Sequence, residues 1–261
     1  MAGIARPNEE NMKTELSKYL SPSRLENIIC LEEAESTNTY LKSLAPSASC
    51  GQAVIALRQK SGRGRQGNSF SSPEGGIYLS ILYRLGDFPA EVMPCAAVAV
   101  ARAVKQSCGI ALSLKWVNDL IWQGKKLGGI LAEKEGDGLI IGIGLNVNTP
   151  AFPPELPNAA SLFSLSGKHF DLAALTAAII KELDALAEGY PQNLPQYKEQ
   201  YTALCLNIGR EVRIIRGGEH FTAYAEAIED DFSLLVRHSD GQREKIFFGE
   251  VSIRKPDGNY V

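Results

Sequence analysis

The character of the sequence changes near Leu206, and that change limits the fold more than any other feature. Beyond this point the chain contains only short strand-like segments, at residues 210–216, 221–229, 233–238 and 242–248. The turns that join them are Gly217-Gly218, Asp230-Asp231 and Asp240-Gly241. A stretch of about 55 residues built only of short strands and turns is typical of a small β-barrel. We therefore expect residues 206–261 to form a separate small domain.

The longer part of the chain before this point mixes helical and strand patterns. Apolar residues recur at the helical period in 37–45, 93–108 and 172–186, the last behind the capping residue Asp171. Strand-like segments rich in Ile, Leu and Val lie at 53–57, 76–84, 112–116, 126–133 and 139–148. Because several of them form hairpin-like pairs, they predict an α+β domain with a mixed sheet over residues 29–205. Residues 1–28 are interpreted as a polar tail or a lone packing helix.

Composition and charge exclude several classes of function. A net charge of -3 and a pI near 5.8 argue against a constitutive nucleic-acid binder, because such proteins present basic surfaces. The sequence has no signal-like N-terminus, and no apolar run approaches the ~20 residues of a membrane helix. The 5 cysteines are scattered without a CxxC pair, so neither disulfides nor a zinc site is expected. We expect a cytoplasmic protein with no metal site, no nucleic-acid partner and no membrane partner.

A glycine–arginine loop is the most informative short segment. It reads Gly62-Arg63-Gly64-Arg65-Gln66-Gly67 and matches the pattern G-x-G-x-x-G. A dinucleotide fingerprint would have to open a helix, but here a polar loop and then a strand follow, and the Gly-Lys-Ser/Thr of a Walker loop is missing. Glycines let the backbone approach a ligand, and guanidinium groups hold phosphate or carboxylate. A ligand-binding loop and a basic surface turn both fit this segment taken alone.

Three further segments combine strand patterns with polar side chains. Residues 114–120 read Leu-Lys-Trp-Val-Asn-Asp-Leu, residues 125–131 read Lys-Lys-Leu-Gly-Gly-Ile-Leu, and residues 142–148 read Gly-Ile-Gly-Leu-Asn-Val-Asn. Adjacent glycines weaken a strand unless something must approach its backbone. Each segment alone could be ordinary sheet structure, just as Ser36-Thr37-Asn38 alone could be a helix cap. Taken together, they indicate more than ordinary sheet structure.

In this order and spacing the segments resemble the biotin–protein ligase family over residues 36–254, in the form without an N-terminal DNA-binding domain. The matching motifs are Ser-Thr-Asn, Gln59 with the Gly-Arg-Gly-Arg loop, Lys-Trp-x-Asn-Asp, Lys-Leu-x-Gly-Ile-Leu, Gly-x-Gly-x-Asn and the closing Gly-Glu-Val-Ser-Ile-Arg. The resemblance implies a catalytic domain like that of class II aminoacyl-tRNA synthetases and biotin ligases, followed by an SH3-like β-barrel. It also implies that ATP with Mg²⁺ converts biotin to biotinyl-5′-AMP, and that biotin then passes to a lysine of a biotin carboxyl carrier domain.

The resemblance also implies roles for individual residues. Contacts with the ureido ring and neighbouring parts of biotin are implied for Ser36, Thr37, Asn38 and Gln59. The loop that closes over biotin and the adenylate phosphate would contain Gly62, Arg63, Gly64 and Arg65.

The resemblance assigns the remaining matched residues to the reacting groups, to adenine and to the closing motif. Lys126 would reach the biotin carboxyl group and the α-phosphate, with Gly129 against biotin and Lys115 near the phosphates. Asp119, which follows Asn118 in the second motif, is implied in the transfer step. The other implied binding residues are Asn146 and Phe70 at adenine, and Glu250 and Arg254 of the closing motif.

Two positions depart from the family pattern. Phe70 stands where Trp is common, which puts affinity for adenine in question, and Val117 stands where Pro is common, which should matter little. The alternative functions are a lipoate–protein ligase, which shares the adenylation chemistry, and a non-catalytic regulator that senses biotin. The segment before Ser36 is short for a winged-helix domain, and the charge is unfavourable for DNA. A homodimer is compatible with the sequence.

Overall fold

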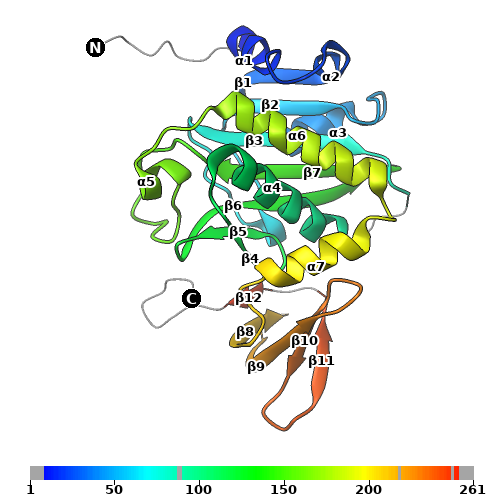
Figure 1. Ribbon diagram of the computed structural model, residues 1–261, viewed down its shortest axis with the longest axis vertical. Coiled ribbons are helices and arrows are strands. Elements are labelled where there is room, and N and C mark those ends of the chain that lie inside the picture. The colour runs from blue at the N-terminus through cyan, green and yellow to red at the C-terminus, as the bar shows by residue number, and fades with distance from the viewer. Residues whose placement is uncertain (1–8, 87–89, 217–218, 248–249, 253–261) are drawn as a thin grey trace.

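The computed structural model describes residues 9–86, 90–216, 219–247 and 250–252. Figure 1 shows a large sheet crossed by helices and a smaller sheet at one end of the molecule. The large sheet has 7 strands in the order β1-β2-β3-β7-β6-β5-β4, and the smaller sheet has 5 in the order β11-β10-β9-β8-β12. The predicted α+β class, with a mixed sheet followed by a separate small all-β unit, is confirmed.

The large sheet is built from the strands that carry the polar motifs. They are β1 (Ile28–Ala34), β2 (Ala53–Gln59), β3 (Gly76–Tyr83), β4 (Ser113–Lys115), β5 (Asp119–Trp122), β6 (Lys125–Glu135) and β7 (Gly138–Asn146). β1 and β2 run parallel, and the other neighbouring pairs are antiparallel. The predicted β5–β6 turn contains Gln123 and Gly124, whose φ values of 48° and 69° are those of a tight hairpin turn.

Each face of the large sheet has its own apolar cluster. Successive strand residues point to opposite faces, so Ile55 and Ile141 join one cluster while Val54 and Ile140 join the other. The first cluster lies under helices α4 (Val92–Cys108) and α6 (Leu172–Gly189), which cross the sheet in Figure 1. The second contains Leu41 of helix α3 (Thr37–Leu44), so α3 covers the opposite face. No described helix is long and apolar enough to cross a membrane.

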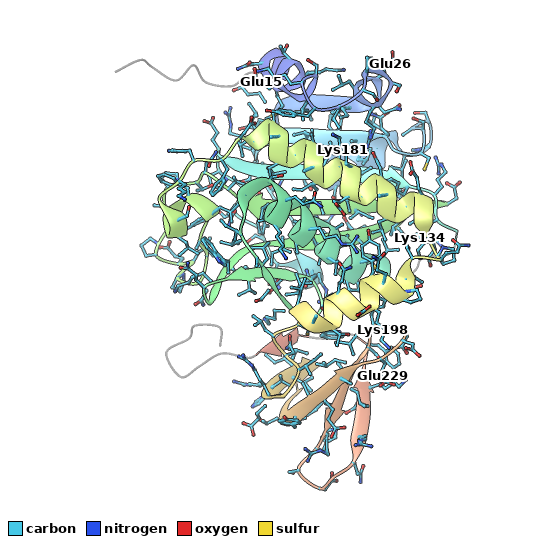
Figure 2. The ribbon with its side chains drawn as sticks, viewed as in Figure 1. Glu15, Glu26, Lys134, Lys181, Lys198 and Glu229 are labelled. Carbon is cyan, nitrogen blue, oxygen red and sulfur yellow. The ribbon has the colours of Figure 1, made fainter. Side chains whose placement is uncertain are left out.

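The apolar residues of helix α6 form one buried stripe, as the helical period in residues 172–186 predicted. Asp171 accepts a hydrogen bond from the backbone N–H of Ala174, which caps the N-terminus of the helix. The side chains of the stripe that are fully or almost fully buried are Leu175, Ile179, Leu183 and Leu186. Lys181, labelled in Figure 2, lies on the exposed face of the same helix. The stripe is core, as expected from its period.

Replacing Leu183 by alanine is expected to lower the free energy of unfolding by about 2–5 kcal/mol, because the site cannot fully collapse around the lost methyl groups. Leu183 lies on the buried face of α6 and is 0% exposed. The matched control is Lys181→Ala on the exposed face, which we expect to change stability by less than about 0.5 kcal/mol. Urea denaturation of both variants measures the difference, and equal effects would mean that α6 does not pack as described.

The N-terminal segment packs against the main domain. Helix α1 (Glu9–Leu16) packs beside β1 and α6, with Leu16 0% exposed, and the short helix α2 (Pro22–Glu26) follows it. Arg24 anchors α2, since its Nε lies 2.7 Å from Oδ2 of Asp184 on α6. Residues 9–26 thus contain two helices, instead of the polar tail or the lone helix that the sequence suggested, because α1 buries Leu16 against the main domain and Arg24 of α2 pairs with Asp184.

The smaller sheet is joined to the large domain through Trp116. Its strands are β8 (Arg210–Arg216), β9 (Glu219–Ile228), β10 (Leu234–Arg237), β11 (Arg243–Ile246) and β12 (Glu250–Ser252), and all described pairings are antiparallel. The indole N–H of Trp116 donates to the carbonyl of Phe232 at 3.0 Å, and the backbone N–H of Trp116 donates to Asn207 Oδ1 at 2.8 Å. The remaining α-helices of the described residues are α5 (Leu162–Ser166) and α7 (Leu194–Leu204), and α7 leads into this sheet. We propose a domain boundary at residues 205–206.

Candidate active site

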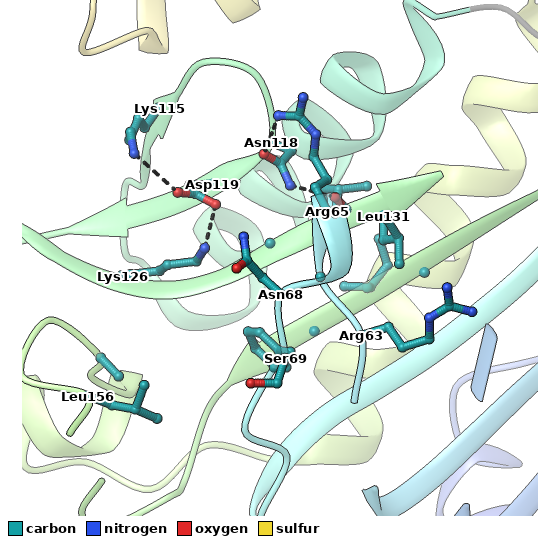
Figure 3. A pocket seen from close by; sticks show the side chains of 18 of the residues that line it. Arg63, Arg65, Asn68, Ser69, Lys115, Asn118, Asp119, Lys126, Leu131 and Leu156 are labelled. Carbon is teal, nitrogen blue, oxygen red and sulfur yellow. Dashed lines mark hydrogen bonds and ion pairs between the residues drawn. The ribbon is translucent and has the colours of Figure 1, made fainter. Parts of the chain in front are cut away.

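A cavity of about 650 Å³ lies between the start of α3, the glycine–arginine loop, strands β6 and β7, and the loop 155–159. This volume is in the range of sites for small ligands. Figure 3 shows side chains of the glycine–arginine loop, the segment 115–119 and β6 converging on it. The predicted site residues that line it are Ser36, Thr37, Asn38, Gln59, Arg63, Gly64, Arg65, Phe70, Lys115, Asn118, Asp119, Lys126 and Gly129. Residues from distant motifs therefore share one site.

Four predicted residues are not among those that line the cavity. Gly62 lines a neighbouring hollow, which shares Gln59, Ser69 and Phe70 with the cavity. Asn146 is buried beneath the cavity, where its Nδ2 donates to the carbonyl of Ala160 at 3.1 Å and its Oδ1 has no hydrogen-bond partner among the described residues. Glu250 lies in β12, but its side chain is outside the described part, and Arg254 lies outside the described residues altogether.

The neutral end of the cavity, formed by Ser36, Thr37, Asn38 and Gln59, is held by hydrogen bonds within the protein. Ser36 caps α3, which puts Thr37 and Asn38 in its first turn. Gln59 Oε1 accepts from the backbone N–H of Thr37 at 2.8 Å, and Gln59 Nε2 donates to Ser72 Oγ at 2.8 Å. The four residues themselves carry no formal charge, and the fourth, Asn38, is held by Ser80 and Glu133.

The charged end contains one carboxylate between two lysines. Lys126 Nζ lies 2.6 Å from Asp119 Oδ1, and Lys115 Nζ lies 3.7 Å from Asp119 Oδ2. Lys115 and Asp119 are 4% and 9% exposed, whereas the Lys126 side chain is 36% exposed and reaches the cavity. Figure 3 shows these contacts as dashed lines. The excess of cations makes this end a place for an anionic group.

A β-bulge in the β5–β6 pair directs Lys126 into the cavity. The register shifts between Leu120 and Ile121, which pair with Gly128 and Lys126 respectively. In a regular strand Leu127 and Gly129 would point to the same face. The bulge breaks this alternation, so Leu127 is buried in the core at 0% exposure and Lys126 lines the cavity. The carbonyl and N–H of Lys126 also bond to Ala160 and Asn158, which holds the loop 155–159 beside the cavity.

The glycine–arginine loop folds back on itself above the cavity. The backbone N–H of Phe70 donates to the carbonyl of Gly62 at 2.8 Å, and a Cβ at Gly62 would collide with the Phe70 carbonyl, so this close approach requires glycine. Arg65 Nη1 donates to Asn118 Oδ1 at 3.3 Å. Arg63 points away from Asp119 in Figure 3, and its Nη2 lies 3.8 Å from Glu133 Oε1. The two arginines therefore hold different partners in this state.

The ring of Phe70 packs against Gly144 of β7, where any larger residue would collide with it. A Cβ at Gly144 would come within 2.6 Å of Phe70 Cε1, so glycine at this position makes room for the ring. The ring also meets Tyr78 edge-on, with centroids 6.4 Å apart. The aromatic face predicted at position 70 is present beside the cavity.

Sequence profiles of known families match two stretches of the chain. The profile of the biotin/lipoate A/B protein ligase family covers residues 31–148, and that of the biotin protein ligase C-terminal domain covers residues 208–254. The bifunctional ligase/repressor BirA of Escherichia coli is 31% identical over 242 residues, which are 88% of this chain and 75% of that protein. The chain belongs to the biotin protein ligase family. The resemblance read from its motifs is confirmed.

Other members of the biotin protein ligase family agree with this assignment. The biotin–[acetyl-CoA-carboxylase] ligase of Mycobacterium tuberculosis is 33% identical over 77% of this chain and 79% of its own length. The biotin protein ligase of Aquifex aeolicus, solved in complex with biotin and ATP, aligns with a TM-score of 0.80 at 30% identity. That alignment covers 87% of this chain and 98% of the Aquifex chain.

Sequence reasoning missed part of the site of this biotin protein ligase family member. Ser80, 0% exposed, lies with its Oγ 2.5 Å from Asn38 Oδ1, and Glu133 Oε2 accepts from Asn38 Nδ2 at 2.8 Å. Glu133 could have been found, because alternate residues of a strand share a face and Glu133 lies four positions after Gly129. Ser80 and the loop 155–159 had no local signal, since both reach the site only through contacts distant in sequence.

Proposed function

We propose that this protein is a biotin–protein ligase that converts biotin and ATP to biotinyl-5′-AMP and transfers biotin to a lysine of a biotin carboxyl carrier domain. The observation that carries the proposal is a single cavity with a neutral hydrogen-bonding end and a cationic end. Biotin has the matching form, because its ureido ring is polar but uncharged and its carboxylate reacts at the other end of the molecule. The family assignment supports the same activity.

The first step needs cations at the place where two anions meet. The biotin carboxylate attacks the α-phosphate of ATP, so negative charge accumulates between them, and fixed positive groups in a site poor in water lower that barrier. We assign this role to Lys126, Lys115, Arg63 and Arg65. Lys126 is best placed, because it is the cavity lysine with the larger exposed fraction. Arg63 and Arg65 sit on a loop that can fold over the adenylate and exclude water.

The second step needs a neutral lysine amine on the carrier domain. A free lysine has a pKa of about 10.4 and is mostly charged at neutral pH. We assign Asp119 to orienting this amine, since its carboxylate already binds two lysine ammonium groups in this state. Binding of the anions would draw Lys126 toward the ligand and leave Asp119 open to the incoming lysine.

We assign adenine to the region of Phe70 and Asn146. The unpartnered, buried Oδ1 of Asn146 supports this assignment, because the exocyclic amino group of adenine is a donor that would satisfy it. Glu250 and Arg254 of the closing motif are also proposed to contribute, because Val251 of the same motif lines the cavity.

Mg²⁺ is proposed to enter with ATP. No cluster of three or more His, Cys, Asp or Glu side chains suited to a metal occurs in the part of the chain that the structure describes. Asp119 is committed to two lysines, so the phosphates and water would supply most of the oxygen ligands that Mg²⁺ requires. The metal would neutralise phosphate charge when bound.

We further propose that the enzyme acts in the cytoplasm, without a nucleic-acid or membrane partner. The five cysteines are free thiols, which fits a reducing compartment. The net charge of -3 is unfavourable for DNA. Light scattering with and without biotin and ATP decides whether two copies associate.

A lipoate–protein ligase is the second candidate, because the matched family includes lipoate ligases. The match of residues 208–254 to the biotin protein ligase C-terminal domain favours biotin. The neutral end favours it as well, since lipoate has an apolar dithiolane ring where biotin has a hydrogen-bonding ureido group.

Replacing Gly129 by alanine is expected to weaken biotin binding about tenfold or more while leaving the melting temperature nearly unchanged. An added Cβ at Gly129 would have ordinary contacts with the protein, the nearest being 3.4 Å from the Asn118 carbonyl, but it would occupy the cavity. Calorimetric titration with biotin measures the affinity. Unchanged affinity would remove Gly129 from the biotin site.

The experiment that tests the proposed function uses the full chain, ATP, Mg²⁺, biotin and a purified biotin carboxyl carrier domain. The mass of the carrier should increase by one biotinyl group on a single lysine, and a carrier in which arginine replaces that lysine should stay unmodified. No mass increase with biotin, or an equal increase with lipoate on a lipoyl domain, would refute the proposal.

A further inference from the structure

A partly buried carboxylate lies next to the neutral end of the cavity. Glu133 on β6 has a side chain only 17% exposed. Its Oε2 accepts from Asn38 Nδ2 at 2.8 Å, and its Oε1 lies 2.7 Å from Lys42 Nζ. Arg63 is more distant at 3.8 Å, with a side chain 50% exposed. Glu133 therefore links one residue of the neutral end to one cation outside the cavity.

The contact with Glu133 decides which way the Asn38 amide faces. A side-chain amide has a donor end and an acceptor end of nearly the same shape, and only its neighbours distinguish them. An ionised carboxylate can only accept, so it requires the NH₂ group of Asn38 on its side. The carbonyl end then faces Ser80, whose Oγ lies 2.5 Å from Asn38 Oδ1.

Other features of the fold preserve this orientation. A Cβ on Gly142 would collide with Asn38 Oδ1, so glycine leaves room for the carbonyl end. Burial opposes ionisation of Glu133, but hydrogen bonds from Lys42 and Asn38 and the charges of Lys42 and Arg63 outweigh it, so its pKa is lowered from the usual value. The carboxylate is therefore ionised at neutral pH, and Asn38 is left with one N–H that has no partner among the described residues.

We propose that Glu133 is a positioning residue for biotin: by fixing the Asn38 amide, it makes the neutral end present an N–H donor to the ureido oxygen. This inference rests on the proposed function. Glu133 does not touch the ligand in this scheme. Its effect passes through Asn38, and it should alter recognition of biotin without altering that of ATP.

The test compares Glu133→Gln with Lys42→Gln by calorimetric titration. Glutamine keeps the size of Glu133 but can offer either end of its amide, so the orientation of Asn38 is no longer imposed. We expect the biotin Kd to rise about tenfold or more, the ATP Kd to change less than about twofold, and the melting temperature to stay close to wild type. Lys42→Gln removes the same ion pair but keeps the carboxylate beside Asn38, so we expect it to bind biotin within about threefold of wild type.

A double-mutant cycle separates positioning from a general structural role. In an Asn38→Ala background, Glu133→Gln should cause no further loss of biotin affinity, because the residue it positions is gone. An equal further loss in that background would overturn the inference, as would wild-type affinity in the single variant or equal weakening of biotin and ATP. If the wild-type chain itself does not bind biotin, the proposed function fails and this inference fails with it.

Discussion

Replacing Lys126 by alanine is expected to reduce biotin-dependent pyrophosphate release by at least about 100-fold, the usual cost of losing one group that stabilises developing charge. Lys126 Nζ is the partly exposed cation of the charged end, 2.6 Å from Asp119. The measurement is a coupled pyrophosphate assay with saturating ATP and biotin. The matched control is Lys125→Ala on the same strand, because Lys125 is not among the cavity residues and directs its Nζ to the carbonyl of Pro157.

Thermal melts accompany this comparison. Both variants should melt close to the wild-type temperature, since neither lysine is in the apolar core. Normal adenylation by Lys126→Ala, or an equal loss in Lys125→Ala, would contradict the role given to Lys126. The family assignment would stand in either case.

Replacing Asp119 by asparagine is expected to separate the two half-reactions. Transfer to the carrier domain should fall by at least about 100-fold, because the incoming lysine loses the carboxylate that orients its amine and meets two cations that are no longer neutralised. Adenylate formation should stay within about tenfold of wild type, since removing a negative charge favours the binding of anions at the charged end. Single-turnover assays that follow pyrophosphate release and carrier modification in the same sample measure both effects.

The competing explanation is that Asp119 only holds the fold of the segment 115–119. Its contacts with Lys115 and Lys126 are 3.7 and 2.6 Å long, and Asp119 itself is 9% exposed, so its loss could disturb both lysines. In that case stability would fall, and both half-reactions would decline in equal proportion. That outcome would refute the division of roles between Lys126 and Asp119.

The sequence predicted those parts of the fold that depend on local sequence patterns. The stripe of α6 and the Gln123-Gly124 turn depend on neighbours within a few residues, so their patterns can be read directly. The segment at α1 was less clear, because its packing depends on β1 and on α6, and α6 lies far away in the sequence. Helix α7 carries few buried side chains, Tyr197 and Tyr201, and gave no comparable stripe.

The candidate site was predicted residue by residue, but the contacts within it were not. The motifs gave Lys126 and Asp119 separately, whereas their ion pair depends on a bulge that no local pattern reveals. Gln59 was expected to face biotin, and in the structure its amide is already bonded to Thr37 and Ser72. A residue's identity can be read from a motif, but its partners come from the tertiary fold.

The measurement that tests the central claim most directly is biotin-dependent exchange of labelled pyrophosphate into ATP, made with the purified full chain and Mg²⁺. Exchange occurs only if the enzyme forms an acyl-adenylate reversibly, so it reports the first step without any carrier domain. We predict exchange with biotin, none without it, little with lipoate, and a loss of at least about 100-fold in Lys126→Ala. Absence of exchange with biotin, or equal exchange with biotin and lipoate, would contradict the account.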